Sequence, residues 1–203
     1  MRWIMTTIGV CALAAGAVVP AAAQQTAASP YAVTFNVNAG GLSPATDLNE
    51  AGTTDFKTGF NVGGGVSVDV WRYLAIRGDF TWGRNQIRAN DVETGVDYNK
   101  FFYGAALQLQ YPTTSGWMPY VFGGGGGITL DPHNDASTVS HTKGAGMFGV
   151  GVNYTIPNSS WQLFGQGTGW VYNLNDMGGA LTGLDKTQLD LFYNLGVAYR
   201  LPF

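Results

Sequence analysis

The last fifteen residues of the chain, 189–203, alternate between large apolar side chains and small or polar ones. The apolar set is Leu189, Leu191, Tyr193, Leu195, Val197, Tyr199, Leu201 and Phe203. This period of two is typical of a β-strand with one apolar face. The alternate positions include Asp190, Asn194, Gly196 and Arg200. We expect lipid, rather than another layer of protein, to cover the apolar face.

Residues 1–23 have the organisation of a secretory signal peptide. Arg2 is basic, an apolar stretch runs from Ile8 to Val19, and Ala21 to Ala23 form a small-residue cleavage pattern. The apolar stretch is shorter than the roughly 20 residues of a membrane-spanning helix, so a helical anchor is the weaker alternative. We therefore predict a signal peptide over 1–23 and a single domain over 24–203.

The period-two pattern also occurs in seven earlier segments of about ten residues, the length of a tilted membrane-spanning strand. The eight predicted apolar faces run from Tyr31 to Val37, Phe60 to Val70, Leu74 to Trp82, Phe101 to Tyr111, Tyr120 to Ile128, Phe148 to Ile156, Trp161 to Val171 and Leu189 to Phe203. In the fifth segment, the predicted outward face contains Tyr120 and Phe122.

The connections between these segments alternate in length. Those at 71–73, 112–116 and 157–160 are tight, whereas those at 40–57, 84–97, 131–143 and 173–187 are long and polar. Short turns on one side and long loops on the other are typical of an outer-membrane barrel. The sequence therefore predicts an all-β, eight-stranded antiparallel up-and-down transmembrane β-barrel, preceded by a cleaved signal peptide.

The positions of the charged residues support a lipid-facing band. Apart from Arg2 and Arg72, the charged residues fall either in the long connections or on the non-apolar face of a strand. Six lie on the non-apolar face of a strand: Asp69, Arg77, Asp79, Lys100, Asp190 and Arg200. A Lys or Arg facing the bilayer centre costs roughly 2–4 kcal/mol. A soluble lipocalin-like barrel is the weaker alternative, because it has a polar outside.

Aromatic residues flank both kinds of connection, as expected for two membrane-interface girdles. Near the tight turns they are Trp71, Tyr73, Tyr111, Trp117, Tyr154, Trp161 and Phe203. Near the long loops they are Phe60, Trp82, Tyr98, Trp170 and Tyr172.

With these residues in place, the chain resembles the small outer-membrane β-barrel family that includes the outer-membrane protein A transmembrane domain and Gram-negative surface and opacity antigens. The most specific feature is the carboxy-terminal assembly signal, matched here by Asn194, Gly196, Tyr199, Leu201 and Phe203. The resemblance implies that the barrel-assembly machinery recognises this segment and that the protein lies in the outer membrane. Pro202 lacks an amide hydrogen, which predicts that the last residues extend past the sheet.

An eight-stranded barrel is just wide enough to be filled by its own side chains. The six inner charges, three acidic and three basic, are therefore expected to pair. Hairpin geometry places Asp69 diagonal to Arg77. Polar residues at 36, 61, 108, 110, 153, 162 and 166 would complete a polar plug. The alternative is a narrow channel for ions or small solutes that these charges gate.

Catalytic and nucleotide-binding patterns are weak. The Gly123–Gly127 run lacks a following GK[ST], and the glycine pattern at 144–149 precedes a strand pattern rather than a helix pattern. Asp131, His133, Asp135, Ser137, Ser140 and His141 share one polar loop. That composition favours solvated loop residues over a rigid catalytic site, so a lipid-modifying enzyme is the least favoured alternative. We expect no enzyme activity, no metal site and no cofactor.

The long loops contain ten acidic and five basic residues. This balance disfavours nucleic acid and other polyanions as partners. Outer-membrane lipid, lipopolysaccharide with its divalent cations, and a possible host or surface ligand at the loops are the expected partners. The sequence thus favours a structural or surface-interaction role that four long extracellular loops perform.

Overall fold

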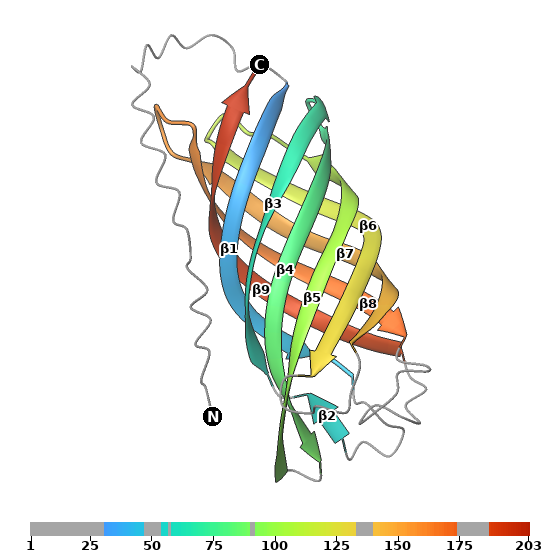
Figure 1. Cartoon of the computed structure of the whole chain (residues 1–203). Helices are drawn as coiled ribbons and strands as arrows, with labels where there is room; N and C mark the ends of the chain where they lie inside the picture. The colour runs from blue at the N-terminus through green and yellow to red at the C-terminus, as the bar shows by residue number, and fades with distance from the viewer. Residues whose placement is uncertain (1–30, 47–53, 57, 90–91, 133–139, 174–186) are drawn as a thin grey trace, which may run out of the picture.

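The computed structural model describes residues 31–46, 54–56, 58–89, 92–132, 140–173 and 187–203. Its strands are β1 (Ala32–Pro44), β2 (Thr54–Phe56), β3 (Gly59–Trp71), β4 (Leu74–Ala89), β5 (Val92–Gln110), β6 (Trp117–Pro132), β7 (His141–Thr155), β8 (Trp161–Asn173) and β9 (Thr187–Pro202). Eight long strands, β1 and β3 to β9, pair antiparallel with their neighbours, and the β4–β5 pairing closes them into a barrel (Figure 1). The predicted eight-stranded barrel is confirmed. The predicted signal peptide, residues 1–23, lies outside the described residues and stays a prediction.

The two ends of the barrel differ in the length of the connections between strands. We call the end with the tight connections β3–β4, β5–β6 and β7–β8 the turn end, and the opposite end the loop end (Figure 1). Strands at the loop end are longer than predicted, because β4, β5, β6 and β7 extend into the expected loops at 84–97 and 131–143. The short strand β2, in the expected loop at 40–57, pairs with the loop-end extension of β4.

The seam between β1 and β9 joins the first and last strands from Ala32↔Pro202 to Pro44↔Asp190. The expectation that the last residues extend past the sheet is wrong, since the Phe203 amide donates a hydrogen bond to the Tyr31 carbonyl at 3.2 Å. A proline near the end of a strand removes one donor only. Residues on both sides of Pro202 can therefore continue the pairing.

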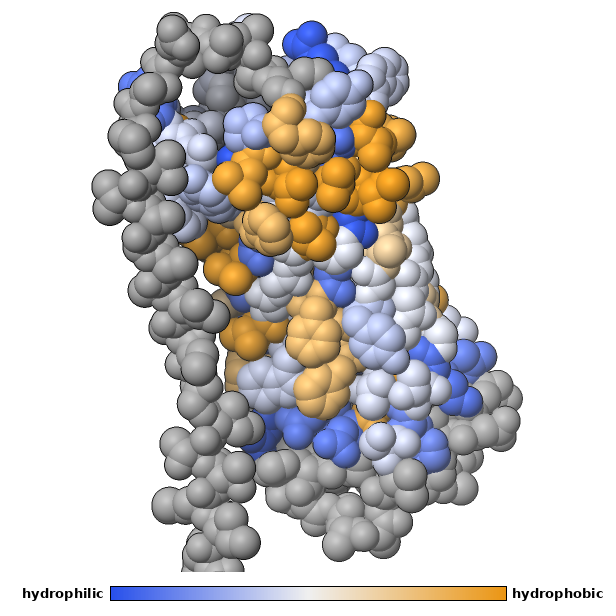
Figure 2. All heavy atoms as spheres, turned by 45° about the horizontal axis from the view of Figure 1, so that its top comes forward, coloured by the Kyte–Doolittle hydropathy of each residue, from blue (hydrophilic) through white to orange (hydrophobic). Residues whose placement is uncertain are grey.

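Large apolar side chains cover the outer wall of the barrel. Leu195 in β9 is 76% exposed, and Val150 in β7 is 60% exposed. On the face shown in Figure 2, apolar side chains gather on the wall, while hydrophilic residues gather toward the two ends. Within the described residues, no helix is long and apolar enough to cross a membrane.

The predicted orientation of the fifth segment, β6, is wrong. Tyr120 and Phe122 point into the barrel and are 5% and 6% exposed, whereas the intervening Val121 is 50% exposed. Both faces of this strand begin with apolar residues, and the glycine run that follows gives no period. Hydrophobic periodicity alone therefore could not choose the face.

Trp170 and Tyr172 also point inward, each 2% exposed, and do not belong to a girdle at the loop end. Trp170 packs against Phe102 with ring centroids 5.4 Å apart. Phe192, on the inner face of β9, packs edge-on against the same Phe102 ring. The inside of the barrel therefore contains a hydrophobic core that the sequence analysis missed.

Inward aromatic rings lie over glycines of the neighbouring strand. Phe122 of β6 is directly opposite Gly149 of β7, and Tyr120 is opposite Gly151. A Cβ atom on Gly149 would lie only 2.7 Å from the Cε1 atom of Phe122. Glycine is therefore required where a ring must lie flat against the wall of a narrow barrel.

Replacing Gly149 with alanine is expected to lower the free energy of unfolding by about 1–3 kcal/mol, because the new methyl group overlaps the Phe122 ring. The control is Gly144→Ala on the same strand, where a Cβ atom meets nothing within 4 Å. Urea-induced unfolding in lipid vesicles, followed by tryptophan fluorescence, measures both. Equal unfolding free energies for the two variants would contradict the packing argument.

Candidate functional site

The inside of the barrel is the candidate site, and Arg77 is its most connected residue. Arg77 and Asp79 lie two residues apart on the inner face of β4. The Arg77 guanidinium donates from Nε and Nη2 to the two carboxylate oxygens of Asp79, each at 2.7 Å. Two parallel charge-assisted hydrogen bonds fix the orientation of the guanidinium plane.

A chain of amides links this pair to a second ion pair. Arg77 Nη1 donates to Gln108 Oε1 at 3.1 Å. The Gln108 amide donates to Gln110 at 2.9 Å, and the Gln110 amide donates to Asp69 Oδ1 at 3.0 Å. Asp69 Oδ2 lies 2.6 Å from Arg200 Nη2. The predicted contact between Asp69 and Arg77 is therefore replaced by two bridging glutamines.

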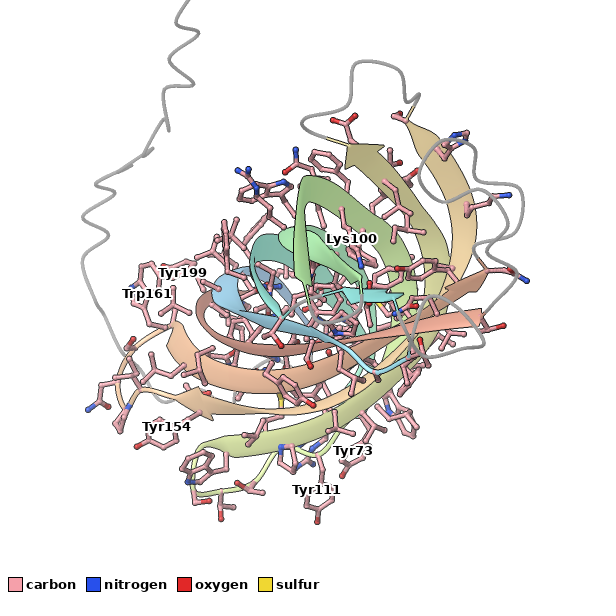
Figure 3. The ribbon with its side chains drawn as sticks, turned by 90° about the horizontal axis from the view of Figure 1, so that it is seen from below. Tyr73, Lys100, Tyr111, Tyr154, Trp161 and Tyr199 are labelled. Carbon is pink, nitrogen blue, oxygen red and sulfur yellow. The ribbon has the colours of Figure 1, made fainter. Side chains whose placement is uncertain are left out.

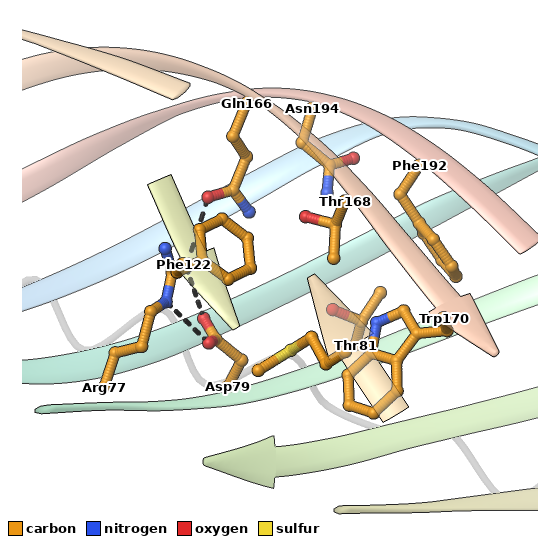
Figure 4. Close-up of a pocket in the computed structure, with 10 residues that line it drawn as sticks. Arg77, Asp79, Thr81, Phe122, Gln166, Thr168, Trp170, Phe192 and Asn194 are labelled. Atoms are coloured by element: carbon orange, nitrogen blue, oxygen red, sulfur yellow. Dashed lines mark hydrogen bonds and ion pairs between the residues drawn. The ribbon is translucent and has the colours of Figure 1, made fainter. Parts of the chain in front are cut away.

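Arg77 also spans the lumen. Its Nη2 donates to Gln166 Oε1 at 3.1 Å, and Gln166 lies on β8, four strands from β4 in either direction around the barrel (Figure 4). The Tyr120 hydroxyl donates to the same Gln166 oxygen at 3.1 Å. The guanidinium carbon lies 4.1 Å from the centre of the Phe122 ring, which adds a cation–π contact.

The space around Arg77 is nearly full. A cavity of about 10 Å³ lies on one side of it, between Asp79, Thr168 and Phe192 (Figure 4). A second cavity of about 30 Å³ lies on the other side and is lined by Asn36 and other polar residues. Each has room for only about one or two water molecules.

An apolar layer lies between this network and the loop end. Its buried side chains come from β1, β5, β6, β7, β8 and β9 and include Leu42, Phe102, Ile128, Leu130, Met147, Trp170, Tyr172 and Phe192. These side chains meet across the lumen, as the contact of Phe102 on β5 with Phe192 on β9 illustrates. The expected polar plug is therefore a polar network at the turn end and an apolar core between that network and the loop end.

Lys100 and Asp190 form a third ion pair at the loop-end edge of the apolar layer, beside Leu130 and Tyr172. Lys100 Nζ lies 2.8 Å from Asp190 Oδ2, and both side chains are completely buried. The Tyr172 hydroxyl donates to the same carboxylate oxygen at 2.9 Å. Seen along the barrel, Lys100 lies inside the ring of strands (Figure 3). The six inner charges thus make three ion pairs.

Residues of the proposed assembly signal lie on both faces of β9. Asn194 points inward and is 4% exposed, whereas Leu201 and Phe203 are exposed on the outer wall. Gly196 lies opposite Phe164 of β8, and a Cβ atom on it would lie 2.6 Å from that ring. Tyr199 packs edge-on against Trp161 at 5.0 Å. The folded barrel therefore uses Gly196 and Tyr199 for packing.

Outward aromatic rings surround the turn end. Figure 3 shows Tyr73, Tyr111, Tyr154, Trp161 and Tyr199 at the outer edge of the barrel. The Tyr73 and Tyr111 rings stack at 6.2 Å, and Trp117 contacts Tyr154 at 4.8 Å. Rings of this kind are expected at a membrane–water interface.

Of the weak catalytic candidates, the structure describes Asp131, Ser140 and His141, and it places Asp131 and His141 on opposite faces of the sheet. His133, Asp135 and Ser137 lie outside the described residues. His141 is paired with the inward Leu130, so Asp131, the next residue, is on the opposite face of the sheet. In the part of the chain that the structure describes, no three His, Cys, Asp or Glu side chains gather as a metal site.

The chain belongs to the outer membrane protein beta-barrel domain family, whose sequence profile matches residues 9–200. It is therefore a small outer-membrane β-barrel protein, whose strands cross the membrane. No curated protein sequence matches the chain.

Solved structures of three bacterial surface or outer-membrane proteins have the same fold. Neisserial surface protein A is 15% identical, with a TM-score of 0.56 and coverage of 88% of this chain and 100% of that chain. OprG from Pseudomonas aeruginosa is 14% identical, with a TM-score of 0.58 and coverage of 87% and 98%. Ail of Yersinia pestis, in complex with the heparin analogue sucrose octasulfate, is 11% identical, with a TM-score of 0.52 and coverage of 84% and 99%.

Replacing Arg77 with methionine is expected to destabilise the barrel by about 3 kcal/mol or more, because the Asp79 carboxylate is left buried without its partner. The double variant R77M/D79N removes both charges and should lose less stability. Urea-induced unfolding in lipid vesicles provides the comparison.

The control for this pair is Arg72→Met in the β3–β4 turn. Arg72 lies over the Tyr73 ring at 5.4 Å, and an exposed contact of this kind contributes about 1 kcal/mol or less. If R77M lost no more stability than R72M or the double variant, the ion pair would not be important for the fold.

Proposed function

We propose that the protein is a closed, rigid barrel whose function is surface interaction through the loop end. The observation that supports this most is the filled lumen. Arg77 contacts Gln166 on the opposite wall, and Lys100 contacts Asp190 on the opposite wall. The apolar layer lies between these two levels. A barrel filled at three levels leaves the loops as the variable part on a rigid scaffold.

The proposed partners follow from charge. Ail was crystallised with a polyanion, the heparin analogue sucrose octasulfate. The long connections of the present chain contain ten acidic and five basic residues. We therefore propose a cationic surface ligand, or lipopolysaccharide bridged by divalent cations, rather than a polyanion. Neither an enzymatic reaction nor a cofactor is part of this proposal.

A narrow channel is the second candidate, because two small cavities flank Arg77 and charged groups line the lumen. Movement of the Arg77 side chain would join these cavities. If the barrel is closed as proposed, Arg77 and its partners stay in place and act as a plug.

Single-channel recording in a planar bilayer separates the two candidates. The refolded protein is expected to show no large steady conductance, and the double variant R77A/D79A is expected to stay closed as well, because the apolar layer and the Lys100–Asp190 pair still fill the lumen. Steady conductance in the unaltered protein, changed by the same substitutions, would favour the channel. The matched control is R72A, which changes a charge outside the lumen.

Replacing residues 174–186 with a short glycine–serine linker is expected to abolish surface binding while the barrel stays folded, because the linker joins β8 to β9 without the native loop. Bacteria that produce the full chain or the variant are compared for adhesion to host cells and extracellular matrix. Heat-modifiable mobility on gels reports the folded barrel. Undiminished adhesion by this variant, and by equivalent replacements of the other long loops, would contradict a surface role.

In the same variants, the assembly segment at residues 194–203 is unchanged. We propose that this segment, with Asn194, Gly196, Tyr199, Leu201 and Phe203, acts as the signal for the barrel-assembly machinery. Loop replacement should therefore leave the amount of protein in the outer membrane unchanged, so lost adhesion would not result from failed assembly.

A further inference from the structure

The ion pair between Lys100 and Asp190 connects opposite walls of the barrel. Lys100 lies on β5 and Asp190 on β9, and four strand steps separate them in either direction around the sheet. Their 2.8 Å contact is at the loop end, and neither side chain is exposed. A single side-chain contact therefore links opposite walls of the barrel close to the points where the long connections begin.

Two more side chains connect this ion pair to the ends of the connection at 174–186. Tyr172, just before that connection, donates its hydroxyl to Asp190 Oδ2 at 2.9 Å. Gln188, just after it, donates its amide to Asp190 Oδ1 at 3.3 Å. Both ends of the connection are thus held at the same carboxylate.

The beginning of the first long connection is held by the same group. Gln188 Nε2 also donates to the Thr46 carbonyl at 3.2 Å. The Leu189 amide donates to the Thr46 hydroxyl at 3.0 Å, and the Ala45 amide donates to the Leu189 carbonyl at 2.8 Å. Residues 45 and 46 therefore continue along β9 past the end of β1.

Stability alone does not explain a completely buried ion pair at this position. Phe102, Leu130 and Phe192 are fully buried around it and are apolar. In such surroundings, apolar residues of similar volume are often neutral or stabilising replacements for an ion pair, because they avoid the desolvation of two charges. What apolar residues cannot do is hold the hydroxyl of Tyr172 and the amide of Gln188 in a defined geometry.

We propose that Lys100, Asp190, Tyr172 and Gln188 form a loop-anchoring cluster, which holds Thr46 and the facing ends of β8 and β9 in one arrangement at the surface-binding end of the barrel. Its members are positioning residues, since they act through the backbone at Thr46 and at both ends of the second connection. The surface role in this inference rests on the proposed function, whereas the anchoring itself does not.

Amide hydrogen exchange, recorded by NMR on the refolded protein in micelles, tests the anchoring directly. In Lys100→Met, exchange of the Ala45 and Leu189 amides is expected to accelerate by about tenfold or more, because local opening at the loop end becomes easier. The amides of Tyr111 and Arg200, which bond to Pro119 and Ser160 at the turn end, should keep their exchange rates.

The matched control is Arg200→Met, which breaks the Asp69 ion pair at the turn end and should leave the Ala45 and Leu189 amides unchanged. Tyr172→Phe removes only the hydroxyl and keeps the ring in the apolar layer. Y172F should accelerate hydrogen exchange of the same two amides by a smaller factor. If K100M does not fold, Y172F alone tests the anchoring. Acceleration at neither amide, or equal acceleration at both ends of the barrel, would overturn the proposal.

Adhesion of bacteria that produce Y172F separates the anchoring from the surface role. Faster exchange at Ala45 and Leu189 together with weaker adhesion supports both. If exchange is faster in Y172F but adhesion is reduced neither in Y172F nor in the loop-replacement variants, the result supports the anchoring cluster and contradicts the surface function.

Discussion

Backbone hydrogen bonding is the constraint on which the rest of this structure depends. In hydrocarbon no water is present to pair with a free amide or carbonyl, so a strand can cross only as part of a closed sheet. Pairing of β1 with β9 and of β4 with β5 removes both edges. The seam between the first and last strands extends over the full length of β1, including the residue opposite Pro202. Closure then fixes the number of strands, the diameter and the inward or outward direction of every side chain.

A small closed diameter determines what the lumen can contain. With eight strands, opposite walls are close enough for Arg77 to reach Gln166 and for Lys100 to reach Asp190. Some inward rings lie flat against glycines of the neighbouring strand, as Phe122 does at Gly149 and Phe164 does at Gly196. The glycines in β6, β7 and β9 are thus part of the packing of the lumen, and no phosphate site is needed to explain them.

The sequence was sufficient to predict the closed barrel, its strand number and its turn end, because lipid on the outside enforces a strict period of two. It also identified the six inner charges, since no charge could face lipid. It failed at Tyr120, Phe122, Trp170 and Tyr172, where both faces of a strand are apolar. For Tyr120 and Phe122, the inward face is the one opposite Gly151 and Gly149 of β7, and that register is a tertiary property. Gln108 and Gln166 were among the polar residues expected in the inner network, and both bond to Arg77. The ion-pair partner was not predicted, because Arg77 pairs with Asp79 on its own strand rather than with Asp69.

The ion pairs at the two ends of the lumen differ in their contact with water. Arg200, in the turn-end network, is 21% exposed, and the network includes three glutamines that can exchange partners. Lys100 and Asp190 are fully buried, and the Tyr172 hydroxyl bonds to both of them at the edge of the apolar layer. An ion pair without access to water cannot exchange its partner for solvent, so its geometry is fixed more strictly than that of a solvated network. The turn end can therefore tolerate rearrangement, while the loop end is held in one arrangement where the long connections begin.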